Sequence, residues 1–108
     1  MSNTSFLGEF EQMILLAILQ GGDDANAYEI RKELDASAGR TVTKGAFYTT
    51  LDRLERKNYL TWTARVADGR RGGMPQRHFQ VTPAGIRELR KSHDALMNLW
   101  RGGVLESQ

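Results

Sequence analysis

The sequence predicts a mainly α-helical (α+β) fold: three helices, a two-stranded β-hairpin and one further helix, in a chain of 108 residues. Three observations predict this order. Apolar residues recur at helical spacing in four stretches, two short stretches alternate apolar and polar residues, and capping residues, glycine or proline stand at the ends of these stretches. A chain of this length suits one domain with a small core.

The first predicted helix spans about residues 6–20, with apolar side chains every three or four positions and a Gly-Gly pair at its end. Its broad apolar face predicts a central place in the core. We expect these leucines to be buried: Leu15, Leu16 and Leu19. Glu9 and Glu11 are expected to lie in solvent.

The second predicted helix begins at Asn26, a capping residue followed three positions later by Glu29, and ends at Gly39. Tyr28 falls in its first turn. Two roles are open for Tyr28: a half-buried packing residue, or a hydroxyl group that contacts a phosphate.

The third predicted helix starts after Thr43, a favourable capping residue, and ends near Asn58, which tolerates the left-handed conformation. Its apolar residues share one side: Phe47, Leu51 and Leu54. The opposite side and its edges are polar and largely basic: Lys44, Gly45, Tyr48, Thr49, Asp52, Arg53 and Arg56. Such a helix is expected to pack on a core with one side and to bind a polar partner with the other.

Two alternating stretches, residues 60–66 and 79–81, predict a hairpin, because the segment between them is rich in glycine. Thr82 and Pro83 then open the last helix. Its apolar stripe comprises Ile86, Leu89, His93, Leu96, Met97 and Trp100. The stripe favours burial against the same helix of a second chain; folding back onto its own domain is the alternative. We therefore divide the chain into a domain at residues 6–82 and a C-terminal dimerisation helix at residues 83–104.

Charge is unevenly distributed, although the net charge is only +2. Residues 1–36 carry two basic and seven acidic side chains, whereas residues 37–91 carry twelve basic and four acidic ones. A basic middle segment indicates a face that meets a polyanion; a basic surface that is merely solvated is the alternative.

The composition argues against several other classes of protein. The chain has no cysteine and two histidines, so neither a disulfide nor a metal site is expected, and no cofactor is predicted. The longest apolar run is too short to cross a bilayer, and the N-terminus lacks the basic start of a secretory signal. We expect a cytoplasmic protein without a membrane segment. The sequence contains no recognisable nucleophile–base pair and no phosphate-binding loop, so an enzyme is not predicted.

Three helices followed by a hairpin are typical of the winged helix-turn-helix, whose third helix enters the major groove of DNA. Arg53 and Arg56 are then candidate donors to guanine or phosphate, and Thr49 is a candidate contact for a thymine methyl group. At the hairpin tip, Arg70 and Arg71 are expected to reach a flanking backbone or the minor groove.

Four segments resemble the PadR family of transcriptional regulators: LGEFEQMILLAIL, AYEIRKEL, GAFYTTLDRLERKNYL and RHFQVTPAGIREL, within residues 7–91. The resemblance implies a bacterial winged-helix repressor that dimerises through a C-terminal helix. It also implies contacts with DNA from Tyr28, Thr43, Lys44, Gly45, Tyr48, Thr49, Arg70 and Arg71. This chain departs from the family pattern at Asn58, where glycine is frequent, and in its single short C-terminal helix.

The resemblance further implies a small hydrophobic effector between the subunits. Trp100 is then either a contact for that effector or part of the dimer core, and His93 is either a hydrogen-bonded interface residue or a pH sensor. The predicted function is a homodimeric regulator of transcription that binds a pseudo-palindromic operator. The alternative is a winged-helix module whose basic face binds an acidic protein.

Overall fold

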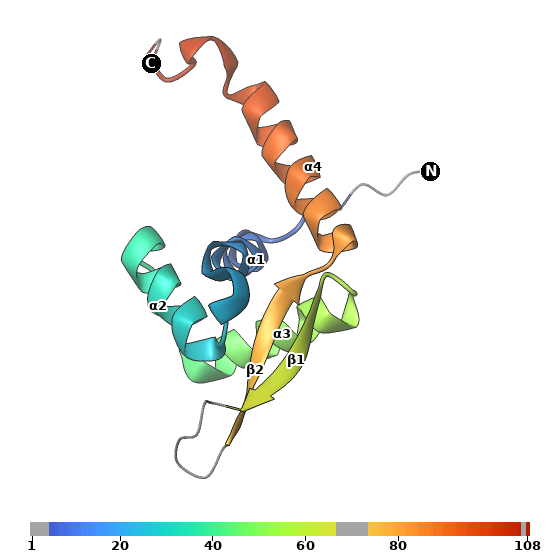
Figure 1. Ribbon diagram of the computed structural model, residues 1–108. Coiled ribbons are helices and arrows are strands. Elements are labelled where there is room, and N and C mark those ends of the chain that lie inside the picture. The colour runs from blue at the N-terminus through green and yellow to red at the C-terminus, as the bar shows by residue number, and fades with distance from the viewer. Residues whose placement is uncertain (1–4, 67–73, 107) are drawn as a thin grey trace.

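The computed structural model describes residues 5–66, 74–106 and 108. Over these residues the elements follow in this order: α1 (Glu9–Gly21), η1 (Gly22–Asp24), α2 (Ala27–Ala38), α3 (Lys44–Arg56), β1 (Leu60–Val66), β2 (Pro75–Val81), α4 (Pro83–Leu99) and η2 (Arg101–Gly103), where η1 and η2 are short 3₁₀ turns. Figure 1 shows α1, α2 and α3 packed beside the hairpin, with α4 pointing away from them. The predicted α+β order is confirmed.

Three helices begin where a side chain satisfies the free N–H groups of the first turn. The side-chain oxygens of Asn26, Thr43 and Thr82 each accept from the backbone N–H three residues later, at 2.9, 3.2 and 3.0 Å. Gly39 closes α2 with a φ of 61°, and Asn58 follows the end of α3 with a φ of 66°. Both lie in the left-handed region that ends helices, as the sequence predicts.

One apolar core joins the helices and the hairpin. Its most deeply buried large side chains are Ile14, Leu15, Ile18, Ile30, Phe47, Leu54 and Leu60. Burial of one such side chain stabilises the fold by about 1.5–3 kcal/mol. Because Phe47, Leu51 and Leu54 of α3 are all buried, the polar side of α3 is held outward.

Several expectations about α1 were wrong. The helix starts at Glu9 rather than near residue 6. Leu16 and Leu19 are exposed, because the elements of a single short chain cover only part of the broad apolar face. Glu11, expected in solvent, is buried: its carboxylate accepts from the Gly8 N–H and from Lys57 Nζ, both at 2.9 Å.

One of the two roles considered for Tyr28, a half-buried packing residue, was also wrong. The side chain stands in the first turn of α2 and is 69% exposed. A half-buried packing residue is therefore excluded, and the phosphate-contact hypothesis stays as a prediction.

The hairpin is antiparallel, with a register that runs from Leu60 opposite Val81 to Val66 opposite Pro75. Its base is buried at Leu60, whereas Val66 near the tip is exposed, so the predicted half-buried alternation holds only at the base of β1. The second strand begins at Pro75, four residues before the predicted start.

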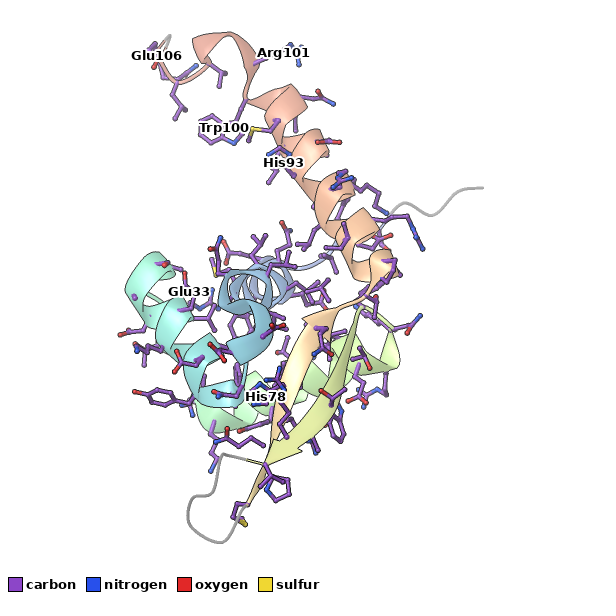
Figure 2. All side chains as sticks on the ribbon, in the orientation of Figure 1. Glu33, His78, His93, Trp100, Arg101 and Glu106 are labelled. Carbon is purple, nitrogen blue, oxygen red and sulfur yellow. The ribbon has the colours of Figure 1, made fainter. Side chains whose placement is uncertain are left out.

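The hairpin is also tied to the turn between α1 and α2. The Phe79 N–H donates to the Ala25 carbonyl at 2.9 Å. Arg65 Nη2 and His78 Nδ1 both contact the Asp23 carbonyl oxygen, at 2.7 and 3.0 Å. The hairpin is thus fixed to the helical part of the domain along its middle and outer parts, with His78 pointing into that junction (Figure 2).

The start of α4 is joined to the turn after α3. Thr82 Oγ1 donates to the Asn58 carbonyl at 2.7 Å, and the Thr82 N–H donates to the Tyr59 carbonyl at 3.0 Å. A Cβ at Gly85 would collide with that same Tyr59 carbonyl oxygen, so only glycine permits this close approach. We refer to these contacts as the α3–α4 joint.

Beyond its first turns, α4 leaves the domain. Leu89 and Ser92 are buried against their own chain, whereas the large side chains further along the helix are exposed. The radius of gyration is 16.3 Å, compared with about 13 Å for a compact chain of this length. Folding back onto the domain, the alternative considered for this helix, therefore applies only to its first half. Among the described helices, none has the length and apolar content needed to cross a membrane.

Candidate nucleic-acid interface

The outward side of α3 carries the polar set that the sequence predicts. These α3 residues are all exposed: Lys44, Gly45, Tyr48, Thr49, Asp52, Arg53 and Arg56. The Tyr48 ring packs edge-on against buried Phe47, with 5.2 Å between ring centroids. This contact orients the tyrosine, and the residue is still 38% exposed, which is a useful arrangement for a side chain that recognises a ligand.

A groove of about 560 Å³ lies where α2, α3 and β2 meet. Its lining comprises Asn26, Ala27, Tyr28, Arg31, Lys44, Tyr48, Pro75, Gln76, Arg77 and Phe79. We call it the helix–wing groove. It brings together three cations and two tyrosines, and its described lining holds no acidic side chain. Cations and hydroxyl donors in a concave surface match a phosphodiester backbone.

A second, smaller groove of about 390 Å³ continues over α2 and the α2–α3 loop. Tyr28 and Arg31 line both grooves, so Tyr28 stands on the border between them. Arg31 is held in place, because its Nη2 donates to the Val42 carbonyl at 3.4 Å and its guanidinium lies 5.6 Å from the Phe47 ring centroid. The second groove adds the cations Lys32 and Arg40 to this surface, together with the carboxylate of Asp35.

Some predicted site residues lie outside the helix–wing groove. Thr43 caps α3, and Gly45, Thr49 and Arg56 lie further around the exposed side of that helix. Arg70 and Arg71 fall outside the described residues, so their role stays a prediction.

Arg53 is close to α1 as well as to solvent. Burial by itself would raise the pKa of Glu11, but the Gly8 N–H, the Lys57 ammonium and the more distant Arg53 guanidinium together hold that pKa below its ordinary value. Arg53 thus contributes to the field around a buried carboxylate at the contact between α1 and α3.

Sequence reasoning missed Arg77, Arg31 and Gln76 as members of the site. The alternation in the sequence predicts the second strand only from Phe79, which leaves Arg77 outside that strand. Extending the strand by two residues towards the N-terminus would have placed Arg77 on the same side of the hairpin as Phe79.

A second exposed surface, apolar in character, lies on the outer half of α4. Leu96, Met97 and Trp100 are each about half exposed, at 49%, 48% and 51%, and we call them the outer stripe. Figure 2 shows His93 and Trp100 on the part of α4 that projects from the domain. The residues predicted for the dimer interface therefore fall into two groups. Leu96, Met97 and Trp100 are exposed, whereas Leu89 is covered by its own chain and Ile86 is partly covered, which leaves little exposed surface on these two for a partner.

Comparison with known proteins gives a consistent picture. The family model described as "Transcriptional regulator PadR-like family" matches residues 15–91. No curated protein sequence matches the chain.

Similar solved structures share the fold. A PadR-like transcription factor from Bacteroides fragilis is 24% identical, with a TM-score of 0.67 over 83% of this chain and 82% of that one. A PadR-like regulator from Bacillus cereus is 21% identical, with a TM-score of 0.62 over 86% and 92%. PadR of Bacillus subtilis, solved in complex with operator DNA, is 20% identical, with a TM-score of 0.62 over 81% of this chain and 46% of its own.

Proposed function

Because this chain belongs to the PadR-like family of transcriptional regulators, we propose that it represses transcription as a homodimer bound to a pseudo-palindromic operator. The family consists of regulators and not of enzymes. The observation that carries the proposal is the helix–wing groove, where Tyr28, Lys44 and Tyr48 converge beside the exposed side of α3. The operator-bound relative from Bacillus subtilis supports DNA as the polyanion.

In the proposed complex, α3 enters the major groove with its first turns leading. Thr49 and Tyr48 meet base edges, and Gly45 allows the helix backbone to approach the DNA closely. Arg53 and Arg56 reach guanine or phosphate from the later turns. Contacts that position the protein on the backbone come from Thr43, Lys44, Tyr28 and, on the wing, Arg70 and Arg71.

The dimer in this proposal forms through the outer stripe of α4. Half-exposed Leu96, Met97 and Trp100 lose water-exposed apolar area when they pack against a second copy, which is favourable by about 25 cal/mol per Å². Exposed Leu16 and Leu19 on α1 offer further apolar surface. A two-fold dimer places its two α3 helices about 34 Å apart, one turn of DNA.

A small, flat hydrophobic compound bound between the subunits near Trp100 is the proposed effector, and the cytoplasm is the proposed location. His93 is proposed as an interface residue. Its Nδ1 lies 3.1 Å from Asp94 Oδ1, so a local partner already orients the ring.

The test is fluorescence anisotropy on the DNA upstream of the protein's own gene and on a scrambled duplex, across a salt series. We expect tight binding to the first, weaker binding to the second, and affinity that falls steeply with salt. Weak, equal binding to both duplexes, together with salt-dependent binding to an acidic protein, would instead support the interaction-module hypothesis.

Substitutions then separate the two kinds of contact. Thr49→Ala and Tyr48→Phe are expected to reduce the preference for the operator over the scrambled duplex. Arg70→Gln combined with Arg71→Gln is expected to weaken binding to both duplexes alike. An equal loss on both duplexes for all of these variants would contradict the assignment of α3 to base recognition.

A further inference from the structure

Arg77 on β2 is held by a short series of side chains that crosses from α3 to the hairpin. Its guanidinium carbon lies 4.6 Å from the centroid of the Trp62 ring on β1. Trp62 Nε1 in turn donates to Glu55 Oε2 on α3, at 3.2 Å. A half-buried tryptophan thus connects the recognition-type helix to the hairpin and also supports an arginine on its ring face.

This arrangement leaves the donors of Arg77 available. A guanidinium stacked on an aromatic ring uses its flat face for the stack and keeps its N–H groups pointing outward from the edge. Within the described part of the chain, no hydrogen bond or ion pair engages Arg77. The residue also lines the helix–wing groove with Lys44, Tyr28 and Tyr48, so its free edge belongs to the same basic, concave surface.

The chemistry of the groove selects an anionic oxygen ligand for that edge. Two parallel N–H groups of a guanidinium match two oxygens of a phosphate, and a fixed guanidinium loses less rotamer entropy when it binds. Arg77 lies on a strand rather than on α3, at the border between the helix and the hairpin, where a DNA strand would leave the major groove towards the wing.

We propose that Arg77 binds a backbone phosphate of DNA at the junction of α3 and the wing, and that Trp62 is the positioning residue that holds its guanidinium. The inference rests on the proposed function, since it takes DNA as the ligand. The bond from Trp62 to Glu55 fixes the position of the indole between α3 and the hairpin.

The experiment measures anisotropy of the full chain on the two duplexes defined above, over a salt series. Arg77→Gln is expected to weaken binding to both duplexes on the order of tenfold, the scale of a charge-assisted hydrogen bond. It should also make the salt dependence shallower: the magnitude of the slope of log affinity against log salt should fall by about 0.9 per protomer. Arg77→Lys keeps the charge but not the planar stack, so it should retain the slope and still bind several-fold more weakly.

Variants of Trp62 test the positioning role. Trp62→Phe retains an aromatic face and loses the N–H bond to Glu55, whereas Trp62→Leu removes the face. We expect near-native affinity for the first and a several-fold loss for the second. Arg87→Gln is the matched control, because it removes one exposed cation from α4, away from the helix–wing groove. Thermal unfolding of every variant identifies any that lose the fold.

Each outcome decides the inference. An Arg77→Gln slope equal to that of Arg87→Gln, or a loss confined to one duplex, overturns the phosphate contact. Native affinity for folded Trp62→Leu overturns the positioning role alone. If the unmodified chain binds neither duplex at low salt, the proposed function fails, and the inference fails with it.

Discussion

The helix–wing groove and the outer stripe are both exposed, but they are exposed for different reasons. The charged and hydroxyl-bearing side chains of the groove are well solvated by water, and several of them are held by stacking or hydrogen bonds within the chain. The outer stripe consists of apolar side chains on a helix that leaves its own domain. The groove is therefore stable without a ligand, whereas the stripe is favoured only when covered. The difference suits a reversible partner at the first surface and a lasting one at the second.

The largest expected effect comes from placing a charge in the outer stripe. Leu96→Glu should convert the proposed dimer to a monomer, because a carboxylate would be buried in an apolar interface. Affinity for a two-site operator should then fall by about 100-fold or more, since the second half-site contact is no longer intramolecular. Sedimentation velocity and anisotropy check both effects.

The matched control is Asn98→Glu, which adds the same charge to the opposite side of α4. It should leave the mass of the assembly unchanged. A dimer that survives Leu96→Glu would place the interface elsewhere on the molecule.

A smaller effect is expected in the groove. Lys44→Gln removes a cation at the start of α3 and should weaken binding to the operator and the scrambled duplex on the order of tenfold, with a shallower salt slope. The dimer should be unaffected, which anisotropy and sedimentation together can verify. Loss of the dimer in this variant would mean that the two surfaces are not independent.

The contact between α1 and α3 gives a third prediction, through Glu11. The folded-state pKa of Glu11 is lowered, so the folded chain binds protons less readily than the unfolded one. The ion pair with Lys57 thus stabilises fully above the unfolded pKa of about 4.3, and this contribution is lost as pH falls through the folded pKa.

Glu11→Gln should accordingly cost about 1 kcal/mol of unfolding free energy at neutral pH, since Lys57 is partly exposed and solvent screens the pair. The difference from the unmodified chain should shrink in acid. Urea titrations at pH 7 and pH 3 measure it. Glu9→Gln, at an exposed pair with Arg40, is the control and should change stability far less at either pH. A cost for Glu11→Gln that is equal at both pH values would rule out the ionised carboxylate as its source.

The smallest effect is expected at the border of the two basic grooves. Tyr28→Phe removes only a hydroxyl from a side chain that is 69% exposed. We expect a loss of DNA affinity of about two- to threefold, on both duplexes, with no change in unfolding temperature. Unchanged affinity would remove Tyr28 from the proposed contacts.

Periodicity was enough to predict which side of α3 faces the core. Phe47, Leu51 and Leu54 are buried because their spacing matches the helical repeat, and this result also placed Lys44 and Thr49 outside. Capping chemistry located the starts of α2, α3 and α4 for the same reason: the signal and its effect lie within four residues of one another.

The positions of the wrongly predicted residues depend on how elements that are far apart in the sequence pack together. Glu11 is buried because Lys57, forty-six positions later, reaches it from the end of α3. Arg77 joins the groove because the hairpin register brings it beside α2 and α3. Leu16 and Leu19 match the helical pattern, but the elements of the described chain leave about half of each side chain exposed. These features depend on contacts between residues that are far apart in the sequence, which local sequence patterns do not predict.

The α3–α4 joint has a mechanical consequence. Thr82 donates to the Asn58 and Tyr59 carbonyls in the turn after α3, and Gly85 lets α4 pack directly against the Tyr59 carbonyl, so α4 is fixed to the end of α3 by three close contacts. A helix of 17 residues is about 25 Å long. If two copies join through their α4 helices, each α4 transmits movement from the crossing to its own domain. A rotation of about 5° between the helices at the crossing shifts the domain end of each α4, and the α3 attached to it, by about 2 Å. In such a dimer, a compound bound at that crossing changes the spacing of the two α3 helices, and thereby weakens DNA binding, without contacting either helix–wing groove.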